Sequence, residues 1–174
     1  EIPRRAAVIR ILVCELNRIS SHLIGVGALA MDIGAATPFT HGLAEREWVN
    51  NLLDEICGAR LTFNFIRIGG VWMDAPVGWT ERIIEFLAHF EPALKEFNKL
   101  ISYNEIFVSR LANVAVVSYE EAIDFGLVGP NLRGSGFRFD LRRDEPYSLY
   151  SELDFDVPIG RGERGRLGDS YDRY

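Results

Sequence analysis

The chain has 174 residues, of which 48% are hydrophobic and 25% are charged, as expected for a globular protein that buries a hydrophobic core. Its net charge of -6 argues against nucleic acid as a partner, because a surface that binds phosphates needs an excess of basic residues. No apolar run reaches the roughly 18 residues that a membrane span requires, since Arg10, Glu15 and Arg18 interrupt the first long helix. We therefore expect any membrane association to go through partners.

The first part of the chain predicts two long helices. Residues 3–31 carry apolar side chains on most faces, which indicates a long, mostly buried helix, and Gly34 suits its end. Thr37 and Pro38 supply a cap and a first-turn proline for a second helix. We expect that helix to run to about residue 66 and to stop at Gly69.

A third helix and two short ones follow in the predicted order. Thr80 is a plausible cap for a helix with apolar residues at helical spacing up to residue 101, and Pro92 should kink or split it. A short helix is expected over 104–112. Ser118 and Glu121 then have the spacing of a capping box, which predicts the start of another short helix.

The periodicity changes after residue 128. Alternating apolar and polar residues at 137–140 and 153–157 predict short strands and ordered loops, and the Gly-rich, basic segment 160–168 predicts a mobile loop. We expect a helical bundle over 1–128 and an irregular segment of loops and short strands over 129–174. The chain starts without Met and ends without a helix-ending signal, so both parts are interpreted as a fragment of one larger domain.

The chain offers no obvious metal or phosphate site. Cys14 and Cys57 are far apart and are interpreted as free buried thiols, with a disulfide as the alternative. Glu85 and His89 are the only pair near the spacing of a di-metal carboxylate bundle, and one pair cannot close such a site. The glycine-rich stretch 129–136 lacks the Lys-Ser/Thr ending of a phosphate loop.

Two polar residues of the first helix are candidates for function. His22 and Asp32 stand among apolar and small residues, where a charged carboxylate is costly unless it gains a partner. The structural interpretation is a hydrogen-bonded core histidine and an aspartate that bonds local amides at the helix end. The functional interpretation is a carboxylate that orients a histidine elsewhere.

Short motifs throughout the chain carry a family resemblance. They include ELNRISSHL (15–23), DIGA (32–35), GARL (58–61), IRIGGV (66–71), LRGSG (132–136), DLRR (140–143) and YDRY (171–174). In this order and spacing they resemble the quinone-site subunit, lettered D, of NADH-quinone oxidoreductase, respiratory complex I, over essentially the whole chain. That family is distantly similar to the large subunit of nickel-iron hydrogenases, so the resemblance implies a mainly α fold with minor β, built on a long-helix bundle that is incomplete here. The nickel-binding cysteine pairs of the hydrogenases are absent, which favours quinone chemistry.

The resemblance implies a quinone cavity between this subunit and a neighbour that carries the terminal iron-sulfur cluster, while NAD(H) binds elsewhere in the complex. The family's headgroup histidine and tyrosine lie before residue 1. Asp32 matches the aspartate that bonds that histidine, and His22 matches a nearby supporting position. Thr62 stands where many relatives have a histidine close to the cluster, which suggests a lower cluster potential and a menaquinone-type enzyme. Arg67 and Arg133 are candidates for fixing loops at the interface with the cluster-carrying subunit, or for ordinary loop bracing.

The resemblance also implies a setting for the chain. Expected partners are the subunits lettered B and C in this family, of which the first carries the cluster, and the membrane arm. They would meet at the cytoplasmic side of a bacterial cytoplasmic membrane, without a membrane span in this chain. We expect the isolated fragment to be inactive. The alternatives are a subunit of a related membrane-bound hydrogenase complex, which shares the fold, and a non-catalytic helical scaffold that bridges partners.

Overall fold

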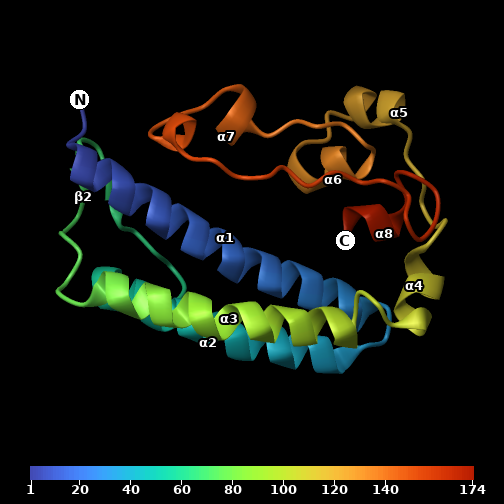
Figure 1. Ribbon diagram of the computed structural model, residues 1–174, viewed down its shortest axis with the longest axis horizontal. Coiled ribbons are helices and arrows are strands. Elements are labelled where there is room, and N and C mark those ends of the chain that lie inside the picture. Colours follow the sequence, from blue (N-terminus) through green and yellow to red (C-terminus); the bar gives the residue numbers. More distant parts are fainter. The chain divides into compact units, whose positions relative to one another are not determined.

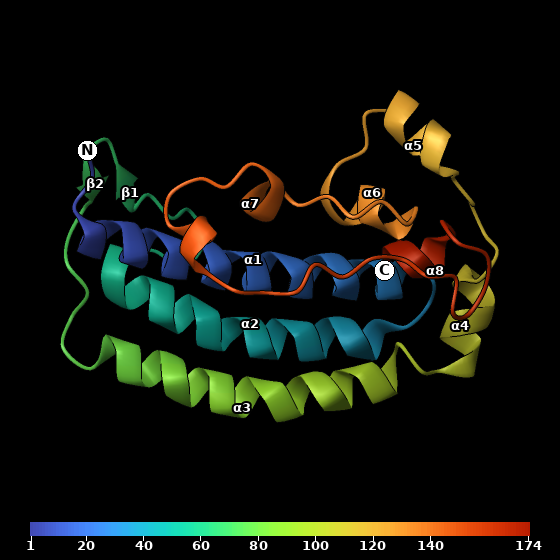
Figure 2. The same ribbon diagram turned by 45° about the horizontal axis from the view of Figure 1, so that its top comes forward.

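Three long helices that run side by side form the first of two units in the computed structural model, which describes residues 1–174 (Figure 1). This unit spans Glu1–Ile101 and contains α1 (Arg4–Asp32), α2 (Ala36–Cys57) and α3 (Trp79–Leu100). Figure 2 shows α2 between α1 and α3. The only sheet in the chain has two strands, so the prediction of a mainly α fold with minor β is confirmed.

Glycines in the left-handed conformation end the first two helices. Gly34 has a φ of 95°, and its N–H donates to the Met31 carbonyl at 2.9 Å, as the sequence predicted. The predicted end of α2 was wrong. Gly58, with a φ of 68°, stops that helix well before residue 66, and its N–H donates to the Asp54 carbonyl. A left-handed residue cannot continue an α-helix, so the chain leaves α2 there.

The chain between α2 and α3 forms a β-hairpin that contacts α1. Strands β1 (Ile66–Arg67) and β2 (Gly70–Val71) pair antiparallel, with Ile66 opposite Val71. Gly69, with a φ of 88°, makes the tight turn between them. The sequence had placed helix in the first part of this segment, and the early stop at Gly58 is the reason that it is free to pair as strands.

Gly78, and not Thr80, precedes the first residue of α3. Pro92 lies inside the helix without dividing it, so the predicted split does not occur. The hydrophobic core of the unit joins side chains from all three helices and from the loop after α2. Its fully buried members include Val49, Leu53, Ile56, Trp79 and Phe86.

The second unit, Ser102–Tyr174, consists of short helices joined by loops. The predicted helix over 104–112 is confirmed as α4 (Glu105–Leu111), and the predicted capping box is present at the start of α5 (Tyr119–Asp124). The remaining helices are α6 (Gly129–Gly134), α7 (Leu141–Asp144), the 3-10 helix η1 (Tyr150–Glu152) and α8 (Ser170–Arg173).

The strands predicted after residue 129 were wrong. Segments 137–140 and 153–157 do not pair with each other or with any strand. Side chains bind their backbone instead, as where Arg143 donates to the Phe155 carbonyl at 2.7 Å. The two units divide after Ile101, whereas the sequence placed the change of character after residue 128. No helix is both long enough and apolar enough to span a bilayer.

Candidate functional site

His22 and Asp32 are both exposed, so their predicted burial was wrong. The buried side of α1 is a narrow stripe at helical spacing that includes Leu16, Leu23 and Ala30. Both polar residues lie beside this stripe. Apolar residues on the flanks of the helix are only half buried, and the sequence pattern counted them as core.

Asp32 is the last residue of α1, and its side chain makes no hydrogen bond or ion pair within the chain. The backbone around it is fixed, since the Ile33 and Ala35 N–H groups donate to carbonyls of the last turn at 3.2 and 2.8 Å. A carboxylate at a helix C-terminus faces the negative end of the helix dipole, and no basic residue offsets it in the last turn. The helix therefore gains no stability from Asp32, which presents an unused acceptor from a rigid position.

A cavity in the first unit lies at the other end of α1, near its N-terminus. It has a volume of about 430 Å³ and a mainly apolar lining that includes two arginines. At 1.5 Å per helical residue, Asp32 lies about 30 Å along the helix from the nearest lining residue, Leu12. None of the five site residues predicted from the sequence lines this cavity. Its lining residues are Arg4, Arg5, Val8, Ile9, Leu12, Ala75, Trp79 and Thr80.

Thr62 and Arg67 lie in the segment between α2 and α3, and both are exposed. The Arg67 guanidinium donates to the side chain of Asn64 and to the Ile66 carbonyl, so it braces its own loop. The Arg67 carbonyl in turn accepts from Arg10 of α1. The Arg67 side chain thus braces the backbone at the start of β1, and its role at an interface stays a prediction.

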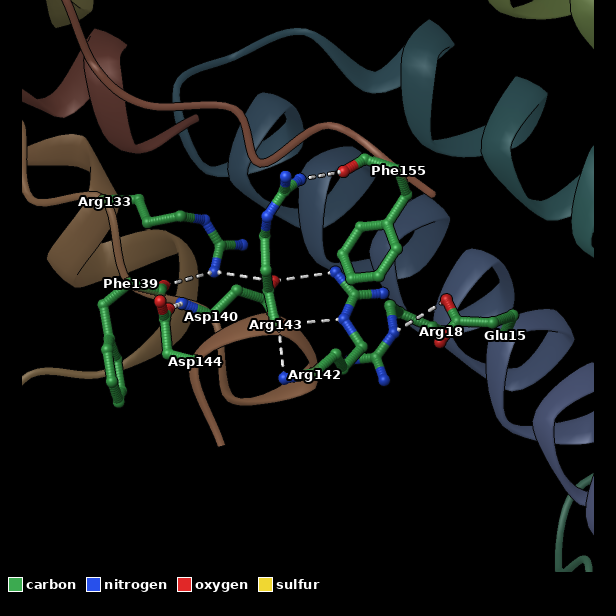
Figure 3. A network of polar contacts seen from close by, with 9 residues as sticks. All are labelled: Glu15, Arg18, Arg133, Phe139, Asp140, Arg142, Arg143, Asp144 and Phe155. Atoms are coloured by element: carbon green, nitrogen blue, oxygen red, sulfur yellow. Dashed lines mark hydrogen bonds and ion pairs between the residues drawn. The ribbon is translucent and has the colours of Figure 1, made fainter. Parts of the chain in front are cut away.

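Arg133 belongs to a buried charge network in the second unit (Figure 3). At its centre is Asp140, whose side chain is 6% exposed and accepts two bonds from the Arg142 guanidinium, at 2.8 and 3.0 Å. Arg133 adds a contact at 3.3 Å. The hydrogen bonds from Arg142 lower the pKa of Asp140 from 3.8 to about 2, against the opposing effect of burial. Arg133 is thus fixed inside the unit by Asp140.

The sequence motif at the end of the chain organises the second unit, which sequence reasoning missed. The Asp169 carboxylate, fully buried, accepts from the N–H groups of Asn113, Tyr171 and Asp172 at 2.7 to 3.0 Å. The Arg173 guanidinium donates to the Gly168 and Asp169 carbonyls and to Ser135. An aspartate directly before Ser-Tyr-Asp is a cap signal that could have revealed the first of these roles.

The loop 160–168 was predicted to be mobile, and in the structure hydrogen bonds tie it to the rest of its unit. The N–H groups of Gly162 and Gly168 donate to the Asp172 carboxylate, at 2.9 and 3.2 Å, and the Gly168 carbonyl accepts from Val117. Both cysteines are free, as predicted, but each is only partly buried. No group of three or more His, Cys, Asp or Glu side chains lies close enough to hold a metal ion.

Comparison with known proteins places these residues in a family. The sequence profile of the respiratory-chain NADH dehydrogenase 49 kDa subunit matches residues 32–174. The chain belongs to this family. An NADH-quinone oxidoreductase subunit, lettered D, from Sorangium cellulosum is 59% identical over the whole chain, which covers 45% of that protein. Its counterpart from Bacillus cytotoxicus is 50% identical, and the chain covers 46% of it.

This member of the 49 kDa subunit family thus spans about half the length of the curated relatives that it matches. Asp32 is the first residue of the family match, and Thr62, Arg67 and Arg133 lie within it. His22 lies before it, in the part that only the full-length relatives cover.

Proposed function

We propose that the chain forms one side of the quinone-reducing site of NADH-quinone oxidoreductase, where electrons pass from the terminal iron-sulfur cluster of a neighbouring subunit to quinone, coupled to proton translocation. The observation that supports this is Asp32. In a member of the 49 kDa subunit family, an exposed carboxylate without a partner ends a rigid helix, in a position that does nothing for the helix itself.

The chemistry needs a proton donor beside the quinone, because reduction to the quinol takes up two electrons and two protons. A histidine from a part of the subunit outside residues 1–174 would donate its ring N–H to Asp32. The carboxylate then fixes the ring orientation and favours the protonated imidazole, which can pass a proton to a quinone oxygen. The site is composite, so the chain alone has only one of its groups.

The other predicted site residues do not contact the Asp32 carboxylate. His22 lies ten residues before Asp32 on α1, about 15 Å along the helix, so it supports the surroundings of the site and does not contact the same proton. Arg67 and Arg133 hold loops that face the cluster-carrying subunit, each through bonds within its own unit. A further peripheral subunit and the membrane arm complete the assembly, which sits at the cytoplasmic side of the bacterial cytoplasmic membrane.

Thr62 favours menaquinone as the acceptor. A protonatable imidazole near a cluster stabilises the reduced state, and a threonine hydroxyl cannot take up that proton. The cluster potential should therefore be low and only weakly dependent on pH. A redox titration of the assembled enzyme checks this: the Thr62→His variant should gain a pH dependence that approaches about 59 mV per pH unit. A strongly pH-dependent potential in the unaltered enzyme would contradict it.

The role of Asp32 is tested with Asp32→Asn in the assembled enzyme. Loss of the charge removes the support for the protonated histidine, so NADH-to-quinone activity should fall about 100-fold or more. Activity with an artificial acceptor that takes electrons before the quinone site should stay unchanged. Asp124→Asn is the matched control, since Asp124 is also an exposed aspartate at the end of a helix, α5. Equal activity of Asp32→Asn and the control would refute the role.

A further inference from the structure

The chain reverses direction directly after Asp32, in a short turn that joins α1 to α2. Two backbone hydrogen bonds close this turn. The Gly34 N–H donates to the Met31 carbonyl at 2.9 Å, and the Ala35 N–H donates to the carbonyl of a residue inside the helix, Ala30, at 2.8 Å. This pair of bonds is the Schellman motif, which needs a left-handed residue just after the helix. Gly34 meets that need with a φ of 95°.

The position of the Asp32 carboxylate depends on the backbone of this turn. The side chain makes no hydrogen bond or ion pair within the chain, so no side-chain partner holds it. Asp32 lies inside the closed turn, and Ala30, at one end of the turn, is fully buried. The two helices also meet at close range beside it, since a Cβ at Gly27 of α1 would lie 3.0 Å from the Cα atom of Phe39 in α2. The turn is therefore fixed on a packed base.

A side chain at position 34 would disturb this arrangement. At a φ of 95° an L-residue is strained, because its Cβ approaches a carbonyl oxygen of the backbone. Alanine at position 34 would relax towards a negative φ, and the hydrogen bonds donated by residues 34 and 35 would be lost. The last turn of α1, which contains Asp32, would then fray. Asparagine adopts positive φ more readily than alanine and should disturb the turn less.

We propose that Gly34 is a positioning residue of the quinone site and that it acts through Asp32. The inference rests on the proposed function, in which this carboxylate accepts a hydrogen bond from a histidine outside residues 1–174. Such a bond requires a distance of about 2.6 to 3.2 Å between the donor and acceptor atoms. A misplacement on the order of 1 Å can cost about 100-fold in rate. Gly34 thus supports the rate of quinone reduction without a side chain that contacts the quinone.

The second unit contains the same motif, which provides a matched control. Helix α5 ends at Asp124, an exposed aspartate, and Gly126 follows with a φ of 66°. The Gly126 N–H donates to the Ile123 carbonyl at 2.9 Å. The Leu127 N–H donates to the Ala122 carbonyl at the same distance. A Cβ at Gly126 would meet no atom within 4 Å, so alanine there adds backbone strain without a clash, at a turn outside the proposed site.

The test compares Gly34→Ala, Gly34→Asn and Gly126→Ala, with rates measured per mole of purified, assembled enzyme. Gly34→Ala should lower kcat for quinone reduction about 10-fold or more and change KM for quinone less than about 2-fold, because the carboxylate acts on proton transfer. Gly34→Asn should stay within about 3-fold of the unaltered enzyme, and Gly126→Ala should match it. In an enzyme that already carries Asp32→Asn, Gly34→Ala should cause no further loss, because both changes remove the same interaction.

The positioning role would be rejected by equal activity of Gly34→Ala and Gly126→Ala, by equal losses with alanine and asparagine at position 34, or by a loss confined to KM. A further loss when Gly34→Ala is added to Asp32→Asn would reject it too, as would failure of Gly34→Ala alone to assemble, which would place Gly34 in folding. An inactive Asp32→Asn with a fully active Gly34→Ala would leave the proposed function standing. A fully active Asp32→Asn would reject the proposed function itself.

Discussion

Asp140→Asn isolates the contribution of one charge to the stability of the second unit. The asparagine keeps the shape and the cap acceptor but removes the charge that the Arg142 and Arg133 guanidiniums contact. The pKa of Asp140 is lowered from 3.8 to about 2 in the folded chain, chiefly by the hydrogen bonds from Arg142. At 1.36 kcal/mol for each pKa unit, this corresponds to about 2 kcal/mol of stability.

The pH dependence follows from the direction of that change. Because the folded pKa is the lower one, the contribution is complete above pH 3.8 and is lost as pH falls towards about 2. Urea unfolding should show Asp140→Asn about 2 kcal/mol less stable at pH 7, with a gap that closes below pH 4. Asp156→Asn, at an exposed aspartate of the same unit, should change stability by less than about 0.5 kcal/mol. The reasoning would be refuted if the unaltered chain and Asp140→Asn had the same free energy of unfolding at pH 7, or if their difference were unchanged at pH 2.5.

Packing in the first unit gives two further predictions. A Cβ at Gly42 would lie 2.8 Å from the Leu23 carbonyl oxygen, so Gly42→Ala should cost about 1 to 3 kcal/mol, whereas Gly25→Ala meets open space and should stabilise the helix by up to about 1 kcal/mol. Trp79→Ala removes a fully buried ring and its bond to the Leu52 carbonyl, and should cost about 3 to 5 kcal/mol. Denaturant unfolding measures all three; equal effects at the two glycines, or a Trp79→Ala loss under 1 kcal/mol, would contradict the packing described.

Local signals predicted much of the helical framework. The spacing of apolar residues identified α1, α2 and α3, and the Ser118–Glu121 pair located the start of α5, because both signals act within a few residues. The end of α2 was missed although Gly58 was visible in the sequence. Apolar residues continue after it, and periodicity alone does not reveal that the backbone has left the helix.

The site residues were harder to interpret, because exposure and partners depend on tertiary structure. Hydropathy around Asp32 suggested burial, yet only a stripe of α1 is covered. The binding of Arg133 by Asp140 and the central position of Asp169 depend on residues that the loops bring together. The tight packing of the loop 160–168 could not be predicted either, because it also depends on tertiary structure. A Cβ at Gly165 would lie 2.2 Å from an Asp169 carboxylate oxygen.

Binding of a quinone analogue is the most direct test of the proposed composite site. Affinity is measured for the chain by itself and for the assembled enzyme, each with and without Asp32→Asn. We predict saturable binding in the assembled enzyme alone, weakened by the substitution. Tight binding to the isolated chain, or equal affinity of the assembled enzyme with aspartate or asparagine at position 32, would contradict a composite site that uses this carboxylate.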